Sequence, residues 1–309
     1  MSGMRPWLHW LPRRLRVEAR DLIELVLVPG LAAVLPWRWC FALFRRLARV
    51  RWLYGAACDH ALAHAQARGQ VAPAEAARWL AARRLVTLVD HADHYLAVTR
   101  SDAWMRRHLQ VQGHWPAPGT SGIFCTFHWG AGMWGLRHAH STGLQGHALV
   151  AAMEGSPFAG RRVLHWYVRA RTRSVQHALG RLPLVVSGSL RPVIAALRRQ
   201  EQVLAAVDVP PDQVDASVEI TLLGLQARMP KGLLRLAVSQ QVPVTVYVTG
   251  LDLQTGQRFL RIDQLGVWQN VETLAQAVFG HLEKALQEES AAWHFWGEAP
   301  RFFRAPPSP

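Results

Sequence analysis

The sequence predicts an α/β protein with a mostly parallel sheet flanked by helices, preceded by a helical N-terminal region. Two observations lead to this fold class. From Gly122 onward, short runs of β-branched and aromatic residues alternate with helix-like runs, a pattern typical of a parallel sheet covered on both faces. Over residues 56–108, alanine and leucine recur at helical spacing instead. We therefore divide the chain into a helical region, 1–112, and an α/β domain, 113–305.

The first long apolar stretch, residues 21–36, is predicted to lie on a membrane rather than to cross it. It carries Glu24, is interrupted by Pro29-Gly30 and is shorter than the roughly 20 residues that a spanning helix needs. We expect a broken hairpin or a pair of short helices here. Segment 21–52 would then rest on an anionic leaflet, because a cluster of arginines follows the apolar run: Arg45, Arg46, Arg49 and Arg51.

The helical stretch that follows contains two groups of residues that could in principle bind a metal. They are His60 with His64, four residues apart, and the single-turn group Asp90, His91, Asp93 and His94. The first group lies in a polar run, and the sequence places no further ligand near either. We expect ordinary helix faces and no metal site.

Six strands are predicted beyond residue 122, together with three helices. The interval before them, 113–122, contains two prolines and reads as a loop. The predicted strands are 123–127, 148–153, 182–186, 203–207, 218–223 and 242–249, and the predicted helices are 191–200, 232–240 and 271–289.

Composition limits the partners and the compartment. The formal net charge of +14 favours anionic partners such as lipid headgroups or an acidic carrier protein. Arginines are spread along the whole chain and no nucleic-acid-binding module is present, so we expect no nucleic-acid role. The three cysteines are scattered without zinc or disulfide spacing, which fits a reducing cytosol. We expect no cleavable signal peptide, because no small-residue cleavage site follows an apolar core.

The stretch from Gly122 to Leu136 has the strongest functional signal. Its predicted strand ends on His128, at the position where α/β proteins place their chemistry. Three glycines follow: Gly130, Gly132 and Gly135. They fit a dinucleotide fingerprint, with Glu154 about 20 residues beyond as the ribose-binding acid. Alternatively, His128 is the functional residue and the glycines allow a tight turn, or the histidine belongs to the core.

An ordered set of motifs resembles the lipid A late acyltransferase branch of the lysophospholipid acyltransferase superfamily, over roughly residues 20–305. In order, the set comprises His128 after the first core strand, the arginine cluster 166–173, the helix beginning near Leu190, the strand 203–207 ending on Asp208, the segments 220–224 and 229–237, Val242-Pro243, the segment 292–296 and Arg301-Phe-Phe. The resemblance implies a lysophospholipid acyltransferase-like fold and argues against the dinucleotide interpretation, which explains nothing beyond Glu154.

The resemblance also implies a catalytic histidine paired with an acid five positions later. A general base is needed because the acceptor hydroxyl has a pKa far above 7, and an acid partner orients the imidazole and stabilises the imidazolium. His128 matches the base, but Met133 occupies the acid position. Three explanations are open. Another acid is supplied in space, with Asp208, Glu154 and Asp212 as candidates; the histidine acts unaided; or the protein has lost this catalysis and keeps the fold to bind a lipid or another protein.

Four further residues are expected to bind substrate. In the family an arginine precedes the acid that follows the next strand. Asp208 fits that acid, so the resemblance implies Asp208 as the catalytic partner of His128. Arg169 or Arg171 fits that arginine, contacting phosphate or carrier. Lys231 and Gly232 open a predicted helix, and a helix N-terminus beside a lysine suits a phosphate. Alternatively, these residues form a surface arginine cluster, a turn aspartate at a strand end and an ordinary exposed lysine.

The preferred hypothesis is an acyltransferase on the cytoplasmic face of a bacterial inner membrane, peripheral or monotopic. It would move a fatty or aryl-polyene acyl group from acyl carrier protein or coenzyme A, as co-substrate, to a lipid or glycolipid hydroxyl, with His128 as base and no further cofactor. The alternatives are a catalytically impaired lipid- or protein-binding homologue on the same fold, and a dinucleotide-binding oxidoreductase.

Overall fold

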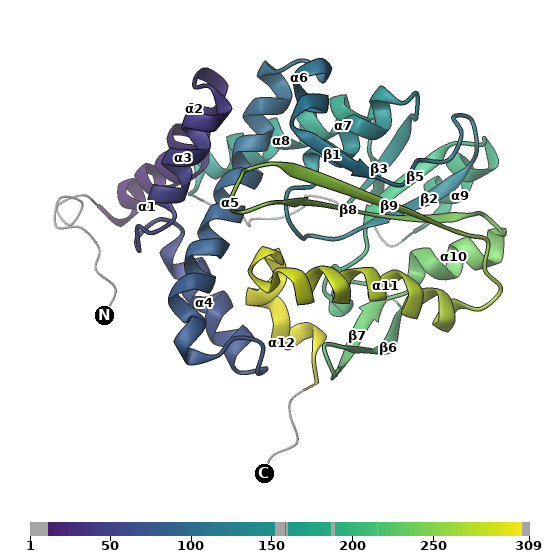
Figure 1. Ribbon diagram of the computed structural model, residues 1–309. Helices are drawn as coiled ribbons and strands as arrows, with labels where there is room; N and C mark the ends of the chain where they lie inside the picture. The colour runs from purple at the N-terminus through teal and green to yellow at the C-terminus, as the bar shows by residue number, and fades with distance from the viewer. Residues whose placement is uncertain (1–11, 152–157, 159, 187–188, 215, 305–309) are drawn as a thin grey trace, which may run out of the picture.

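The computed structural model describes residues 12–151, 158, 160–186, 189–214 and 216–304. Within these ranges a seven-stranded, mostly parallel sheet is flanked by helices, which confirms the predicted α/β class (Figure 1). Strands β8, β2, β5, β3 and β4 run parallel, whereas β9 is antiparallel to β8 and β1 runs parallel to β9. In sheet order the strands are β1 (Leu109–Gln112), β9 (Arg258–Gly266), β8 (Val244–Leu251), β2 (Gly122–Thr126), β5 (Gln202–Ala206), β3 (Gly146–Ala151) and β4 (Leu184–Val186).

Helices precede the sheet and connect its strands. The N-terminal helices are α1 (Arg13–Asp21), a π-helical segment (Leu22–Leu27), α2 (Val28–Val34), α3 (Trp37–Leu47), α4 (Gly55–Gln66), α5 (Ala76–Thr99) and α6 (Asp102–Arg107). The later helices are α7 (Met133–Ser141), α8 (Arg162–Leu179), α9 (Arg191–Arg198), α10 (Gly232–Gln240), α11 (Val271–Glu288) and the short α12 (Ala299–Phe302).

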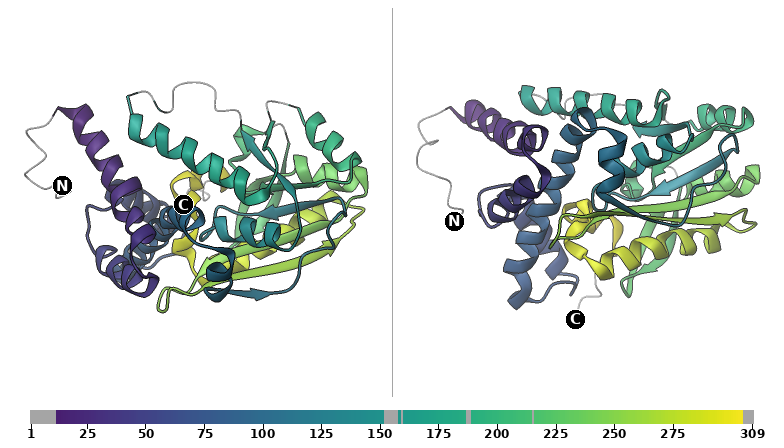
Figure 2. Two further views of the ribbon diagram at one scale, coloured as in Figure 1. Left: turned by 90° about the horizontal axis from the view of Figure 1, so that it is seen from above. Right: turned by 45° about the horizontal axis from the view of Figure 1, so that its top comes forward.

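Strand β2 lies at the centre of the sheet and divides two hydrophobic cores. All of its residues are buried, and their side chains alternate between the two faces. Ile123 and Cys125 belong to the core shared with α9, α10 and α11, and Phe124 belongs to the core shared with α5 and α7. Figure 2 shows these two helical layers on opposite sides of the sheet. Strand β2 is therefore covered by helices on both faces, and its carboxyl end is held in place by the packing on either side.

The predicted break at Pro29-Gly30 is wrong. The chain runs from α1 through the π-helical segment into α2 without leaving helical geometry, and Pro29 follows directly after the π-helical turns, whose changed hydrogen-bond pattern accommodates its missing N–H. The helix ends at Leu35, which precedes Pro36 and is extended. Glu24 points into the protein, where it accepts a hydrogen bond from the backbone N–H of Tyr54 (2.6 Å). None of the described helices is long and apolar enough to cross a membrane.

The predicted strand 218–223 forms outside the main sheet. It is β6 (Ser217–Leu222), which pairs antiparallel with β7 (Leu225–Pro230) in a separate hairpin. The two-residue loop, Leu223-Gly224, has positive φ at both positions, which matches the right-handed twist of the two strands. A strand that returns through so tight a turn pairs antiparallel with its successor, and β6 and β7 form a two-stranded sheet of their own.

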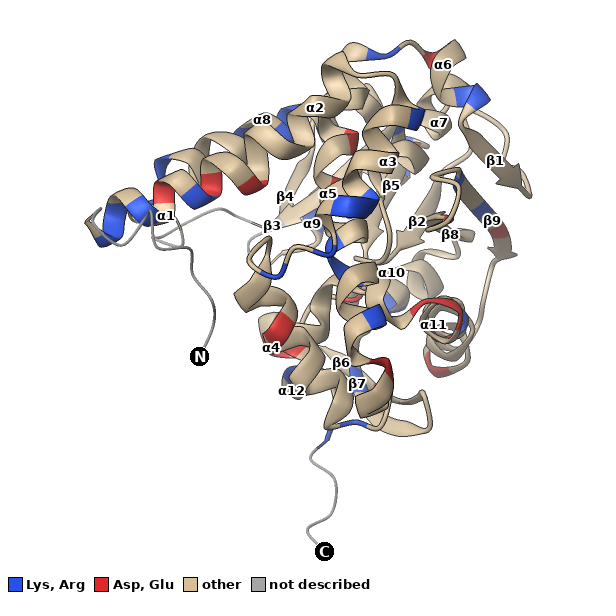
Figure 3. Ribbon diagram, turned by 60° about the vertical axis from the view of Figure 1, so that its left-hand side comes forward, with Lys and Arg blue, Asp and Glu red and all other residues tan. Residues whose placement is uncertain are grey.

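The two parts expected to meet at residue 113 share their packing. Strand β1 precedes that position and yet forms the edge of the sheet. Trp79 and Val86 of α5 lie in the same core as the sheet residues of β2 and β8. Helix α1 lies alongside the start of α8 (Figure 3), where Arg161 pairs with Asp21 at 2.6 Å. The N-terminal helices are thus packed onto the α/β part rather than separated from it.

Candidate active site

His128 is held by a buried carboxylate. Its Nδ1 lies 2.9 Å from Oδ1 of Asp208, and its backbone N–H donates to both carboxylate oxygens at 2.9 Å. Trp293 Nε1 donates to Oδ2 at 2.9 Å. A carboxylate that receives all these N–H groups can only accept, so His128 Nδ1 carries the proton and Nε2 is left with a free lone pair. The His128 side chain is 41% exposed and that of Asp208 is fully buried.

Sheet topology explains why these two residues meet. Strands β2 and β5 are parallel neighbours, with Thr126 opposite Ala206. The pairing continues one residue further, where the N–H of Val207 donates to the carbonyl of Thr126 (2.9 Å). His128 and Asp208 each follow their strand by two residues, so both emerge at the carboxyl edge of the sheet.

The pair tunes the basicity of the imidazole. Burial lowers the pKa of His128, but the charge of Asp208 and the hydrogen bond to it outweigh burial, so the net direction is upward from the ordinary value. A raised pKa makes the histidine a stronger base, and the neutral form that accepts a proton is populated above that pKa.

The C-terminal segment 292–296 closes one side of the pair. His294 donates its backbone N–H to the carbonyl of His128 (2.7 Å), and its Nε2 lies 2.8 Å from the carbonyl of Gly130. The ring of Phe295 packs against the ring of His128, with centroids 4.4 Å apart. Arg83 of α5 anchors the segment by donating to the carbonyls of Ala291 and His294. The sequence signalled this segment as part of the motif set, but not its contact with His128.

Burial keeps His294 neutral. It lowers the pKa of His294 to about 4, so near neutral pH the ring has one N–H, which the carbonyl of Gly130 can accept. The residue thus fixes the loop after His128 without adding a charge beside it.

Met133 lies in the apolar core at the first position of α7 and is only 3% exposed. The His128 nitrogen that an acid would orient is already bound by Asp208. Of the acids considered from the sequence, Asp208 contacts His128, Asp212 pairs with Arg301 on the surface and Glu154 lies outside the described residues.

We expect Met133→Glu to destabilise the protein and to leave its activity without gain. The new carboxyl would be buried among apolar side chains, at a cost of about 2 kcal/mol or more that the helix dipole offsets only in part. Urea unfolding measures the cost, and Met133→Leu is the volume-matched control, expected to lose less than about 1.5 kcal/mol. A clear increase in acyl transfer by the glutamate variant would contradict the role of Asp208.

Close packing requires two of the glycines after His128, Gly130 and Gly135, whereas a Cβ on Gly132 would meet no atom within 4 Å. Gly130 has φ +70°, and a Cβ there would lie 2.2 Å from the carbonyl oxygen of Thr249. A Cβ on Gly135 would meet the ring of Tyr247 at 2.6 Å, so this glycine lets α7 lie against β8. A dinucleotide fold also needs the strand after the glycine-rich turn beside the first one. Here β5 separates β3 from β2, so the topology differs from that of a dinucleotide site.

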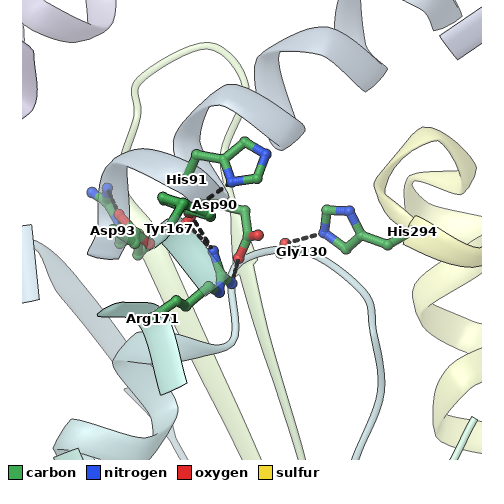
Figure 4. A network of polar contacts seen from close by, with 8 residues as sticks. Asp90, His91, Asp93, Gly130, Tyr167, Arg171 and His294 are labelled. Carbon is green, nitrogen blue, oxygen red and sulfur yellow. Dashed lines mark hydrogen bonds and ion pairs between the residues drawn. The ribbon is translucent and has the colours of Figure 1, made fainter. Parts of the chain in front are cut away.

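Arg171 lies on the inner side of α8 and is paired rather than free. Its guanidinium bonds Oδ1 of Asp90 (2.7 Å) and the hydroxyl of Tyr167 (3.2 Å), while His91 Nδ1 lies 2.7 Å from the same hydroxyl. Figure 4 shows this network beside Gly130 and His294. Beside Arg171 the pKa of Asp90 is held at about 2 in spite of burial, which raises it. The Arg171 side chain remains 26% exposed.

Arg169 points the opposite way, because two positions correspond to about 200° around a helix. It lines a cavity of about 360 Å³ on the outer side of α8, together with Arg162, His165, Trp166 and Arg173. The structure therefore assigns the two arginines to different environments.

Lys231 and Gly232 lie at the start of α10, as predicted, with Lys231 as the residue before the helix. The Lys231 amine is 3.4 Å from Glu272, and its side chain is 28% exposed. Leu190, which precedes α9, lies within 4.0 Å of where a Cβ of Gly232 would be. No described contact joins these two residues to His128.

The two groups considered for metal binding have other partners. The ring of His60 packs edge-on against that of His64. In the second group, Asp93 pairs with Arg258 and His94 lies 3.0 Å from the hydroxyl of Ser174. Among the described residues, no group of three or more histidine, cysteine or acidic side chains is arranged to hold a metal ion.

Neither the known protein-family models nor the curated proteins contain a match to this sequence. A function must therefore be argued from the site itself.

Proposed function

We propose that the protein is a membrane-associated acyltransferase in which His128 is the general base and Asp208 is its acid partner. One observation carries the proposal: a fully buried carboxylate holds Nδ1 of His128 at 2.9 Å, while the His128 side chain remains 41% exposed. This arrangement of a base and its orienting acid is the one that activates a hydroxyl for attack on an acyl group.

In the proposed reaction, Nε2 of His128 removes the proton of the acceptor hydroxyl as its oxygen attacks the thioester carbonyl carbon. The new C–O bond forms, the C–S bond breaks, and the imidazolium returns its proton to the departing thiolate. Asp208 accepts the Nδ1–H throughout and stabilises the imidazolium. No electrons are transferred and the acyl group is conserved, so the step needs no redox cofactor.

The donor and acceptor classes follow from charge and the motif set. A formal net charge of +14 suits acyl carrier protein, coenzyme A and phospholipid, all of which are anionic. The resemblance to the lipid A late acyltransferases favours a fatty or aryl-polyene acyl group and a lipid or glycolipid hydroxyl. Arg171 would contact the donor or the acceptor from its position between Asp90 and Tyr167. Localisation at the cytoplasmic face of an inner membrane belongs to the same proposal.

His128→Ala tests this proposal directly. We expect purified wild-type protein to release free thiol from an acyl thioester when membrane lipid is present, and His128→Ala to lose this activity by about 10³-fold or more, because the base is removed. His114→Ala, at an exposed histidine in a loop, is the matched control and should behave as wild type. Acyl transfer by His128→Ala at the wild-type rate would contradict the proposal.

A further inference from the structure

We infer that the outer face of α8, together with the adjoining face of α1, is the surface that docks on anionic phospholipid. This inference rests on the proposed function, because a lipid acceptor places the enzyme at a bilayer. In this inference the face of α8 and α1, rather than segment 21–52, makes the main contact with the membrane. The ligands of its arginines are lipid phosphates.

The outer face of α8 is a continuous basic stripe. Arg162, Trp166, Arg169 and Arg173 are spaced four, three and four residues apart, so they lie on one side of the helix, and all are exposed. They line the cavity of about 360 Å³ described above. Among the described residues, none of these three arginines has an ion-pair partner, whereas Arg161 and Arg171 of the same region are paired with acids.

Apolar side chains accompany the stripe. Trp166 is 50% exposed between the arginines, which suits an interfacial position in a bilayer. On α1, Glu18 accepts hydrogen bonds from the N–H groups of Arg162 and Val163 at the start of α8. Leu15 lies three residues before Glu18 on the same side of α1 and is 53% exposed.

This combination favours a lipid surface over an acidic protein. Guanidinium groups pair with phosphate oxygens, and exposed leucine and tryptophan side chains gain most by entering the boundary between headgroups and acyl chains. The inner side of α8 carries Arg171, which bonds Asp90 and Tyr167, and the charges of Asp90 and Arg171 both act on His128. A lipid docked on the outer side would therefore be separated from the proposed active site by the width of one helix.

Vesicle cosedimentation tests the inference without using activity. The probes are phosphatidylcholine vesicles with and without phosphatidylglycerol, with inorganic phosphate as a competitor. We expect the triple variant Arg162→Gln/Arg169→Gln/Arg173→Gln to bind the anionic vesicles roughly 100-fold more weakly than wild type, since each arginine near the surface contributes about a factor of five to ten. Trp166→Ala should weaken binding several-fold, and inorganic phosphate should compete poorly.

The matched control removes the same charge elsewhere. Arg107, Arg198 and Arg235 are exposed on α6, α9 and α10, and their replacement by glutamine should change binding by less than about threefold. Equal losses in both triple variants would show that diffuse charge is responsible, and an undiminished Arg162/Arg169/Arg173 variant would also overturn the inference. The inference would also be overturned if the Arg162/Arg169/Arg173 variant lost binding to acyl carrier protein while its binding to vesicles stayed intact. His128→Ala should bind vesicles as wild type, so failure of the proposed chemistry and failure of docking are distinguishable.

Discussion

Replacing Asp208 by asparagine is expected to lower the rate of acyl transfer by about 10⁴-fold, as loss of the orienting acid does in a serine-protease triad. Asp208 accepts N–H groups from the backbone of His128, from its Nδ1 and from Trp293. An asparagine has one acceptor oxygen, so its amide NH₂ must face one of these donors. The imidazole would then shift its proton or its orientation. Initial rates of thiol release from the acyl donor measure the effect.

The pH profile separates this role from a general loss of structure. Asp208 raises the pKa of His128, so the wild-type rate should rise with pH through a value above the ordinary 6.5 of histidine. In Asp208→Asn the same inflection should move to lower pH, because the attraction for the imidazolium is gone. Asp212→Asn, at an exposed acid bound to Arg301, is the control and should change neither rate nor profile. A residual rate near that of wild type in Asp208→Asn would contradict the pairing.

Asp93→Asn is expected to lower the free energy of unfolding by about 3–5 kcal/mol. Asp93 and Arg258 form an ion pair in which both side chains are fully buried. The guanidinium also lies between the rings of Trp37 and Trp134, 4.1 Å from each centroid. The substitution would leave this cation without its counter-charge in a place that water cannot reach. Urea unfolding monitored by circular dichroism measures the loss.

An exposed pair supplies the comparison. Asp102 bonds Arg137 at 2.7 Å and its side chain is 50% exposed, so Asp102→Asn should cost no more than about 1 kcal/mol. The pair formed by Asp93 links α5 to β9, and its Arg258 packs on Trp134 of α7. We therefore expect its loss to lower the stability of the whole fold rather than to alter the site selectively. A cost for Asp93→Asn no larger than that for Asp102→Asn would contradict this account.

Local sequence signals predicted the elements that surround the site. The strand before His128 and the strand before Asp208 form within one or two residues of their predicted positions, because their apolar periods and their flanking turns agree. The helix 232–240, away from His128, forms where it was predicted as well. The π-helical segment and the strands β1, β7 and β9 were not predicted. Strand β9 mixes Arg258, Arg261 and Asp263 with apolar residues, and only the packing of Arg258 between two tryptophans explains the first of these.

The preference for Asp208 among the candidate acids came from the family resemblance, because the residues alone do not place any of these acids beside His128. His128 and Asp208 are 80 residues apart, and their contact depends on the pairing of β2 with β5. Strand β3 follows β2 in the sequence but lies on the other side of β5 in the sheet. No local pattern specifies the order of strands in a parallel sheet. The contacts of Trp293, His294 and Phe295 with the site join residues that are even further apart in the sequence. These three residues follow α11, near the end of the described chain.

The most direct test of the central claim is a mass-spectrometric comparison of total lipid extracts from a Gram-negative host that expresses the wild type or His128→Ala. We predict a lipid species heavier by one acyl group in the wild-type extract alone, which would identify both the acceptor and the acyl chain. The same extracts should be treated with purified protein and a range of acyl-carrier-protein and coenzyme A thioesters. Identical spectra in both settings, with both proteins folded and bound to membranes, would contradict acyl transfer by His128.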